Sequence, residues 1–223
     1  MSVRYERLTF DRPGHATVRI ESPDATVIYI DPWSEVLDGT PGDADIVFST
    51  HDDFDHFDPA GIAAVSNEDT IVVIYEAIDA GPLDRDVIRL GTDAQREVAG
   101  LTVQSVPAYN HPDGNHVRSN GEPYHPETTV IGLVLTIDGS RVYYCSDTDA
   151  LEELAGIDAD VVIPPIGGRP TMDRHEAAEL VSSIGPDLVL PVHYNSDVID
   201  GIDADAAAFK EAVEAMGIRV ELF

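Results

Sequence analysis

The sequence is poor in positive charge, in cysteine and in long hydrophobic runs. Its 223 residues include 13 Lys and Arg against 42 Asp and Glu, for a formal net charge of −29. No basic cluster is present to neutralise a phosphate backbone, so the composition argues against nucleic acid as a partner. A single cysteine, Cys145, excludes an intrachain disulfide, which agrees with a reducing compartment. No apolar run approaches the roughly 20 residues of a membrane-spanning helix, so we expect no membrane partner.

The remaining composition is that of a folded and strongly acidic protein. With 43% hydrophobic residues the chain can bury a core, and we expect a single domain over residues 1–223. Lys210 is the only lysine among the basic residues. An acidic, lysine-poor surface suits molar salt, where the Debye length falls to about 3 Å. We therefore predict a halophilic protein, with an ordinary acidic protein as the alternative. Because the first ten residues lack an apolar signal core, we predict a cytoplasmic location.

The spacing of apolar and turn residues indicates mixed α and β structure. A helix is predicted over residues 59–65, where Asp58 can cap it, and another after Asp173, which has Glu176 three positions on. A final helix presents an apolar face from Ala206 to Met216. Strands are predicted at residues 5–10, 16–21, 26–30, 44–49, 70–74, 98–106, 129–137, 141–145, 161–164, 188–193 and 218–223.

Histidine and aspartate residues concentrate directly after the apolar run at residues 46–48. Residues 49–56 read Ser-Thr-His-Asp-Asp-Phe-Asp-His, which places His51, Asp53, Asp55 and His56 in a loop at a strand end. Imidazole and carboxylate ligands together suit zinc, manganese or iron. Two such ions need about seven protein ligands, so more should follow downstream. The downstream candidates are His125, Asp147 and His193.

This series of motifs resembles the metallo-β-lactamase superfamily, whose first motif is H-x-H-x-D-H. Asp53 stands here in the place of its second histidine. Within the superfamily the chain is most similar to the ascorbate-6-phosphate lactonase-like branch of small metal-dependent hydrolases. The similar segments are residues 14–16, 30–32, 51–56, 107–110, 124–126, 143–149, 166–173 and 193–194. The resemblance implies an α+β fold, a four-layer αββα sandwich.

The resemblance also implies two divalent metal ions, most simply zinc, with manganese or iron as alternatives. One ion would be held by His51, Asp53 and His125, the other by Asp55, His56 and His193, with Asp147 bridging them. A hydroxide between the ions would be the nucleophile, and Asp55 would act as the catalytic residue that orients it. Asp53 as a carboxylate favours harder ions; equally, it could mark an empty first site.

Several histidines leave alternatives open. His111 or His116 could coordinate in place of His125, and solvent exposure is the simpler interpretation of both. His15 matches a position of the family, where a hydrogen-bonded structural role is favoured over catalysis. His175, at the start of a predicted helix, is interpreted as a surface residue.

The predicted function is hydrolysis of a small, anionic ester, lactone or phosphodiester. Arg169 follows two glycines between a strand and a helix, where its guanidinium could bind a carboxylate or phosphate of the substrate. A salt bridge to one of many acids is the alternative for Arg169. The alternative function is a catalytically weakened metal- or ligand-binding protein of the same fold, with Asp53 and Ser146 as marks of decay. The expected partner is a small-molecule substrate, and homo-oligomerisation stays open.

Overall fold

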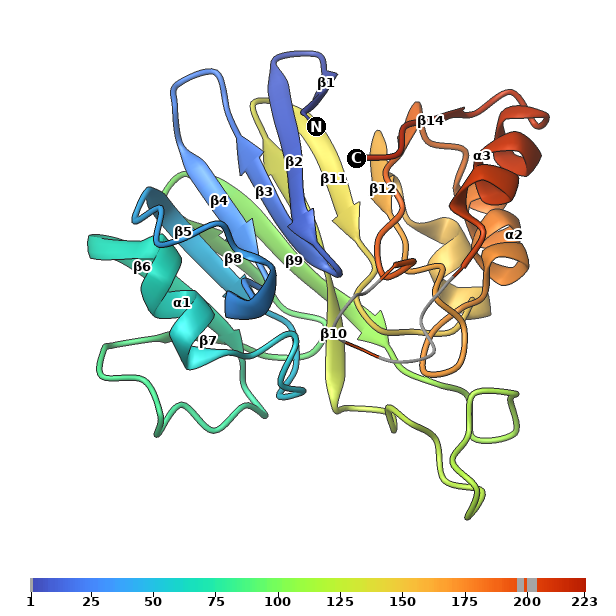
Figure 1. Ribbon diagram of the computed structural model, residues 1–223, viewed down its shortest axis with the longest axis horizontal. Helices are drawn as coiled ribbons and strands as arrows, with labels where there is room; N and C mark the ends of the chain where they lie inside the picture. Colours follow the sequence, from blue (N-terminus) through green and yellow to red (C-terminus); the bar gives the residue numbers. More distant parts are fainter. Residues whose placement is uncertain (1, 196–198, 200–203) are drawn as a thin grey trace. The chain divides into compact units, whose positions relative to one another are not determined.

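Each of two parts of the chain builds a seven-stranded mixed sheet in the computed structural model, which describes residues 2–195, 199 and 204–223 (Figure 1). The first unit comprises Met1–Thr92 with Phe223, and the second comprises Asp93–Leu222. Two mixed sheets with few helices confirm the predicted α+β class. The assignment of residues 1–223 to one domain stays a prediction.

In the first unit the strands follow one another across the sheet in chain order. The strands are β1 (Val3–Tyr5), β2 (Leu8–Gly14), β3 (Thr17–Glu21), β4 (Val27–Ile30), β5 (Ala44–Ser49), β6 (Ser66–Tyr75) and β7 (Ile88–Leu90). Pairing is antiparallel from β1 to β4 and parallel from β4 to β7. The helical segments are η1 (Ser34–Val36) and α1 (Pro59–Val65). The parallel strands therefore direct the ends of β4 and β5 toward the same edge of this sheet.

The second unit repeats this pattern, although the sequence shows no internal repeat. Its strands are β8 (Gln95–Val98), β9 (Leu101–Ala108), β10 (Val130–Ile137), β11 (Ser140–Tyr144), β12 (Val161–Ile163), β13 (Leu188–Val189) and β14 (Arg219–Val220). Pairing is antiparallel from β8 to β11 and parallel from β11 to β14. The helical segments are η2 (Glu152–Gly156), α2 (Arg174–Ile184) and α3 (Ala206–Glu214).

Local sequence signals start the helices as predicted. Asp58 accepts a hydrogen bond from Ala60 N and so caps α1, in which Pro59 is the first residue. Asp173 and Glu176 form a reciprocal capping box at the start of α2. These caps satisfy amide groups that would otherwise lack a partner in the first helical turn.

Two predicted strands are in fact pairs of strands separated by tight turns. The predicted strand at residues 5–10 is divided between β1 and β2, with Glu6 in the left-handed region at φ 49°. The predicted strand at 98–106 is divided by Ala99 at φ 47° and Gly100 at φ 85°. Two consecutive positive φ angles match the turn that joins antiparallel strands most readily. Glutamate carries no strong turn signal, which explains the first error; in the second turn Gly100 does carry one, and it was overlooked.

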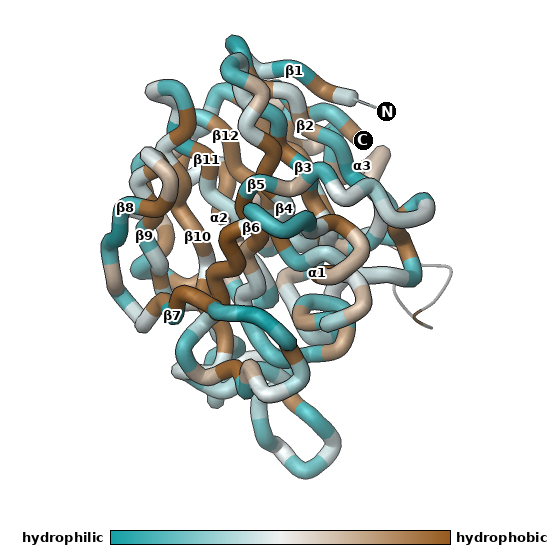
Figure 2. The backbone as a smooth tube through the Cα atoms, turned by 90° about the vertical axis from the view of Figure 1, so that its left-hand side faces the viewer, coloured by the Kyte–Doolittle hydropathy of each residue, from teal (hydrophilic) through white to brown (hydrophobic). Residues whose placement is uncertain are grey.

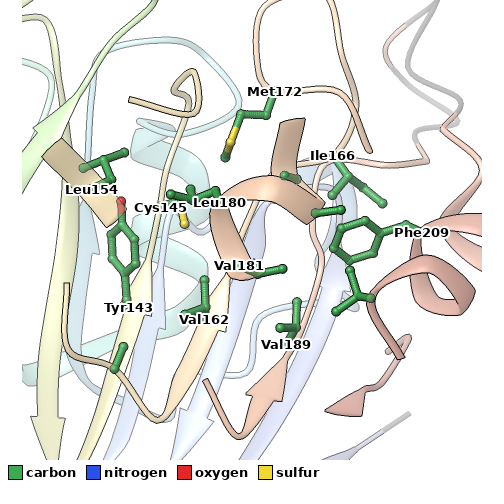
Figure 3. Packing of buried hydrophobic residues seen from close by; sticks show 14 of the residues in the cluster. Tyr143, Cys145, Leu154, Val162, Ile166, Met172, Leu180, Val181, Val189 and Phe209 are labelled. Carbon is green, nitrogen blue, oxygen red and sulfur yellow. The ribbon is translucent and has the colours of Figure 1, made fainter. Parts of the chain in front are cut away.

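The core of the second unit is formed where α2 and α3 pack against the sheet. Leu180 and Val181 of α2 belong to one buried cluster with Val162 and Val189 from the strands and Phe209 of α3 (Figure 3). Buried hydrophobic residues lie along the strands of both sheets (Figure 2). Cys145 is fully buried in the same cluster. None of the described helices is both long and apolar enough to cross a membrane.

Candidate metal centre

In the first unit, the ends of the neighbouring parallel strands β4 and β5 carry the polar residues of the candidate site. Asp31 directly follows β4 and is fully buried, and its carboxylate accepts hydrogen bonds from His56 Nδ1 at 2.7 Å and from Thr50 N at 2.9 Å. Gly61 of α1 approaches this turn so closely that an added Cβ would lie 2.1 Å from the Pro32 carbonyl oxygen. Sequence reasoning gave Asp31 no role, although it lies in a segment similar to the family.

The hydrogen bond from Nδ1 to Asp31 directs the other ring nitrogen of His56 toward Asp55. His56 Nε2 lies 3.6 Å from Asp55 Oδ2, and His51 Nε2 lies 3.7 Å from Asp53 Oδ2. Both separations are longer than an ordinary hydrogen bond. They are close to the roughly 3.4 Å between two ligand atoms on one tetrahedral ion with bonds of about 2.1 Å. The donor types and spacing in this unit therefore fit a transition-metal ion.

His15 is hydrogen-bonded to Asp55, the residue to which the family resemblance assigns the catalytic role. His15 Nε2 lies 2.8 Å from Asp55 Oδ2, and both side chains are buried. One ligand atom from each of His15, Asp55 and His56 lies within 4.8 Å of the others. The observed contact is the hydrogen-bonded arrangement favoured for His15 from the sequence, and it holds the Asp55 carboxylate in a fixed orientation.

Asp53 differs in exposure from the other proposed ligands of this unit, which are buried. Its side chain is 49% exposed, whereas that of His51 is 2% exposed. Asp53 thus faces solvent, beside a buried histidine, at the position where the related family has a second histidine.

Asp53→His is expected to shift metal preference toward zinc without unfolding the protein, because imidazole is a softer ligand than carboxylate. Zinc and manganese offered in equal amounts, followed by elemental analysis, measure the preference. Asp52→His is the matched control, since Asp52 is an exposed neighbour that we do not assign as a ligand. A metal-loaded structure with Asp53 more than about 4 Å from any ion would show it to be a bystander.

In the second unit, three further predicted ligands meet: Asp147 and His193 follow the parallel strands β11 and β13, and His125 lies in the loop between β9 and β10. His125 Nε2 and His193 Nε2 each lie 3.6 Å from the same oxygen, Asp147 Oδ2. All three side chains are buried. Since a carboxylate can serve two ions, an oxygen equally distant from two imidazole nitrogens suits the bridging role that the family resemblance implies for Asp147.

The backbone beside these ligands occupies the left-handed region. Ser146 has φ 60° and His193 has φ 58°. Glycine adopts such angles without the steric cost that other residues have, which explains why glycine is usual at the position of Ser146 in the family motif. Ser146 keeps this conformation, so Asp147 is presented from a turn of that kind despite the substitution. Strained backbone of this type is concentrated at functional sites.

His111 and His116 lie in the loop between β9 and β10 but take different positions. His116 is buried, with Nδ1 2.6 Å from Asp149 Oδ1 and Nε2 3.4 Å from Glu176 Oε2. The hydrogen bond to Asp149 raises the pKa of His116, although burial opposes the shift. His111 is exposed, and its Nδ1 accepts a hydrogen bond from Asp113 N. The two ring nitrogens of His116 thus face carboxylates other than Asp147, whereas His125 directs Nε2 at Asp147.

Arg169 lies on the exposed turn that follows β12. Its backbone has φ 65°, next to Gly168 at φ 69°. Among the residues that the structure describes, no carboxylate pairs with its guanidinium. Within the part of the chain that the structure describes, this cation is therefore available, and the salt bridge considered as its alternative role does not form there.

Comparisons with known proteins agree on one family. A model of the β-lactamase superfamily domain matches residues 9–193. The chain is 35% identical to a UPF0173 metal-dependent hydrolase of Methanosphaerula palustris, covering 93% of this chain and 91% of that protein. It is 32% identical to a UPF0173 metal-dependent hydrolase of Methanopyrus kandleri, covering 94% and 93%.

Solved structures give the same result for the fold. A proposed metal-dependent hydrolase from Parabacteroides distasonis matches with a TM-score of 0.85 and 28% identity, covering 100% of this chain and 97% of that chain. Igni18, a metallo hydrolase from the archaeon Ignicoccus hospitalis, matches with a TM-score of 0.76 and 25% identity, covering 97% and 94%.

Proposed function

Since the chain belongs to the metal-dependent hydrolases of the metallo-β-lactamase superfamily, we propose that it uses two divalent ions to hydrolyse a small anionic ester, lactone or phosphodiester. The family and the fold predicted from the motifs are confirmed. Zinc is the simplest choice of ion, with manganese or iron as alternatives. The cytoplasmic location, the halophilic character and the likeness to ascorbate-6-phosphate lactonases stay predictions.

The observation that carries the proposal is a distance repeated in both units. Four histidine Nε2 atoms lie 3.6 to 3.7 Å from a carboxylate oxygen of Asp53, Asp55 or Asp147. These separations are close to the roughly 3.4 Å between two ligand atoms on one tetrahedral ion with bonds of about 2.1 Å, so the spacing favours ions held by these groups. We assign as ligands His51, Asp53, Asp55, His56, His125, Asp147 and His193.

Bound divalent ions would lower the pKa of a bound water molecule and would polarise an oxygen of the substrate. The chain's own residues orient the reactants. Asp55, fixed through Oδ2 by His15, would accept a hydrogen bond from the attacking water and then its proton. Asp31 holds His56 through Nδ1 and so aims Nε2 into the site. Arg169 would bind the negative group of the substrate.

Metal analysis of the purified protein, combined with turnover of bis(p-nitrophenyl) phosphate and of simple lactones, tests this function. We expect bound metal and hydrolysis that chelation abolishes and metal restores. The alternative, a metal- or ligand-binding protein without turnover, is favoured by the carboxylate at Asp53, and it predicts bound metal without hydrolysis of any substrate. Absence of metal after incubation with zinc, manganese and iron would contradict both metal-dependent hydrolysis and metal binding.

Arg169→Ala is expected to raise KM for anionic substrates by about tenfold or more, as for loss of a charge-assisted hydrogen bond worth roughly 1.5–3 kcal/mol. The rate constant kcat should change less, since the contact binds the substrate before reaction. Arg96→Ala is the matched control, because Arg96 is also exposed in the second unit. Unchanged KM for the best substrate, or a best substrate that is neutral, would contradict the role of Arg169.

A further inference from the structure

Asn110 is a fully buried amide that uses both ends of its side chain in the second unit. Its Nδ2 donates to Asp149 Oδ1 at 2.8 Å and to the Pro170 carbonyl oxygen at 2.9 Å. Its Oδ1 accepts from His125 N at 2.9 Å, and its own backbone N donates to the His125 carbonyl oxygen at 2.8 Å. One side chain thus joins three loops that are distant in sequence.

These contacts act on the orientation of the His125 ring. Pro170 O accepts from Asn110 Nδ2 and lies 3.2 Å from His125 Nδ1. Because a carbonyl oxygen can only accept, Nδ1 of His125 carries the hydrogen in this contact. Nε2, which lies 3.6 Å from Asp147 Oδ2, is then the nitrogen that can bind a metal ion. Asn110 therefore holds both the backbone of His125 and the oxygen that fixes its tautomer.

Asp149 is the second anchor of this network. Asp149 receives hydrogen bonds from His116 Nδ1 and from His111 N in addition to the one from Asn110. Asp149 Oδ1 thus accepts hydrogen bonds both from His116 and from the Asn110 amide. Asn110 in turn has its orientation fixed, with the amide toward Asp149 and the oxygen toward His125.

We propose that Asn110 is a positioning residue that sets the tautomer and orientation of His125 for metal binding, and that ties His125 to the turn carrying Arg169. The proposal rests on the proposed metal site. Pro170 directly follows Arg169, so the carbonyl held by Asn110 and His125 also fixes the turn that carries Arg169. Metal affinity and affinity for an anionic substrate should then fall together when Asn110 is replaced.

The test measures zinc affinity by chelator competition in the full chain and its variants. Asn110→Ala should weaken zinc binding about 10–100-fold, the range typical for loss of a partner that orients a metal ligand. Asn110→Asp keeps an oxygen for His125 N but loses both donors and places a second carboxylate beside Asp149. It should therefore lose as much affinity as the alanine variant.

A second readout uses the metal-free protein. Long-range ¹H–¹⁵N NMR of the histidine rings should show His125 protonated at Nδ1 in the wild type and a mixture of tautomers in Asn110→Ala. In a His125→Ala background, Asn110→Ala should cause no further loss of zinc affinity, since the residue acts through that ligand. If Asn110 contributed only to stability, its replacement would leave the tautomer of His125 unchanged.

Two control variants separate this role from general destabilisation. Asn67→Ala removes hydrogen bonds from an amide to two backbone carbonyls in the first unit. Val213→Ala removes a buried contact of α3 in the second unit. Both should retain zinc affinity. Wild-type affinity in Asn110→Ala, or equal losses in Val213→Ala, would overturn the proposal, whereas a wild type that binds no metal would instead overturn the proposed function.

Discussion

Replacing His56 or His193 by alanine is expected to empty or distort the metal centre and to abolish hydrolysis. Both imidazoles are buried and direct Nε2 at a carboxylate, His56 toward Asp55 and His193 toward Asp147. Loss of a ligand should exceed the roughly 10–100-fold effect of losing a group that only orients one. Elemental analysis after exposure to zinc, together with the rate of phosphodiester hydrolysis, measures both effects. Asp147→Asn should act in the same way.

His175→Ala is the matched control for this experiment. His175 is an exposed residue in the first turn of α2, and it has no assigned role. Its variant should keep full metal content and activity, which separates the loss of a ligand from the general effect of removing a histidine. Full metal content and normal activity in both His56→Ala and His193→Ala would remove the site assignment.

Local features of the fold were predictable because their causes are local. Asp58 caps α1 by accepting from Ala60 N, and Asp173 with Glu176 caps α2. In both caps the interacting residues lie within four positions of each other in the sequence. The hairpin at Asp138 and Gly139 forms with both residues at positive φ. The turn at Glu6 was missed because there the pairing of strands imposes a conformation that the residue itself does not favour, whereas at Ala99 the local signal of Gly100 was overlooked.

The candidate site was predictable only as far as its motifs reach. His51, Asp55, His56, Asp147 and His193 stand in recognisable segments. The residues that orient them are joined by contacts distant in sequence: Asp31 is 25 positions from His56, and His15 is 40 positions from Asp55. Asp31 and His56 follow the neighbouring strands β4 and β5, whereas His15 lies in the turn between β2 and β3, on the far side of β4. The order of the strands, which no local signal contains, decides this.

The shared strand pattern gives a physical reason for the location of these residues. In both units, polar residues follow parallel strands, where the ends of adjacent strands lie at one edge. Side chains from neighbouring strand ends can converge there without interrupting the hydrogen bonds of the sheet. This is also the edge at which ligands bind in open sheets with parallel strands.

The acidic composition leads to the largest expected effect on stability. At about 0.1 M salt the Debye length is about 10 Å, so carboxylates on this surface repel one another, whereas at about 1 M it is about 3 Å. Few basic side chains offset this repulsion, and one basic side chain can serve several carboxylates. Arg19, for example, lies within 4.0 Å of Asp11, Glu21 and Asp43. The net charge of −29 therefore opposes the compact state at low salt.

Lowering KCl from about 2 M to about 0.1 M is accordingly expected to reduce the melting temperature by about 10 °C or more, roughly 3–5 kcal/mol for a chain of this length. Thermal unfolding followed by circular dichroism measures the effect, with sucrose in place of KCl as a control that stabilises without screening charge. Replacing the exposed acids Glu152, Glu153 and Glu179, which line one hollow of the second unit, by glutamine should reduce the salt dependence. Equal melting temperatures across the salt range would leave an ordinary acidic protein, because screening would then contribute nothing to its stability.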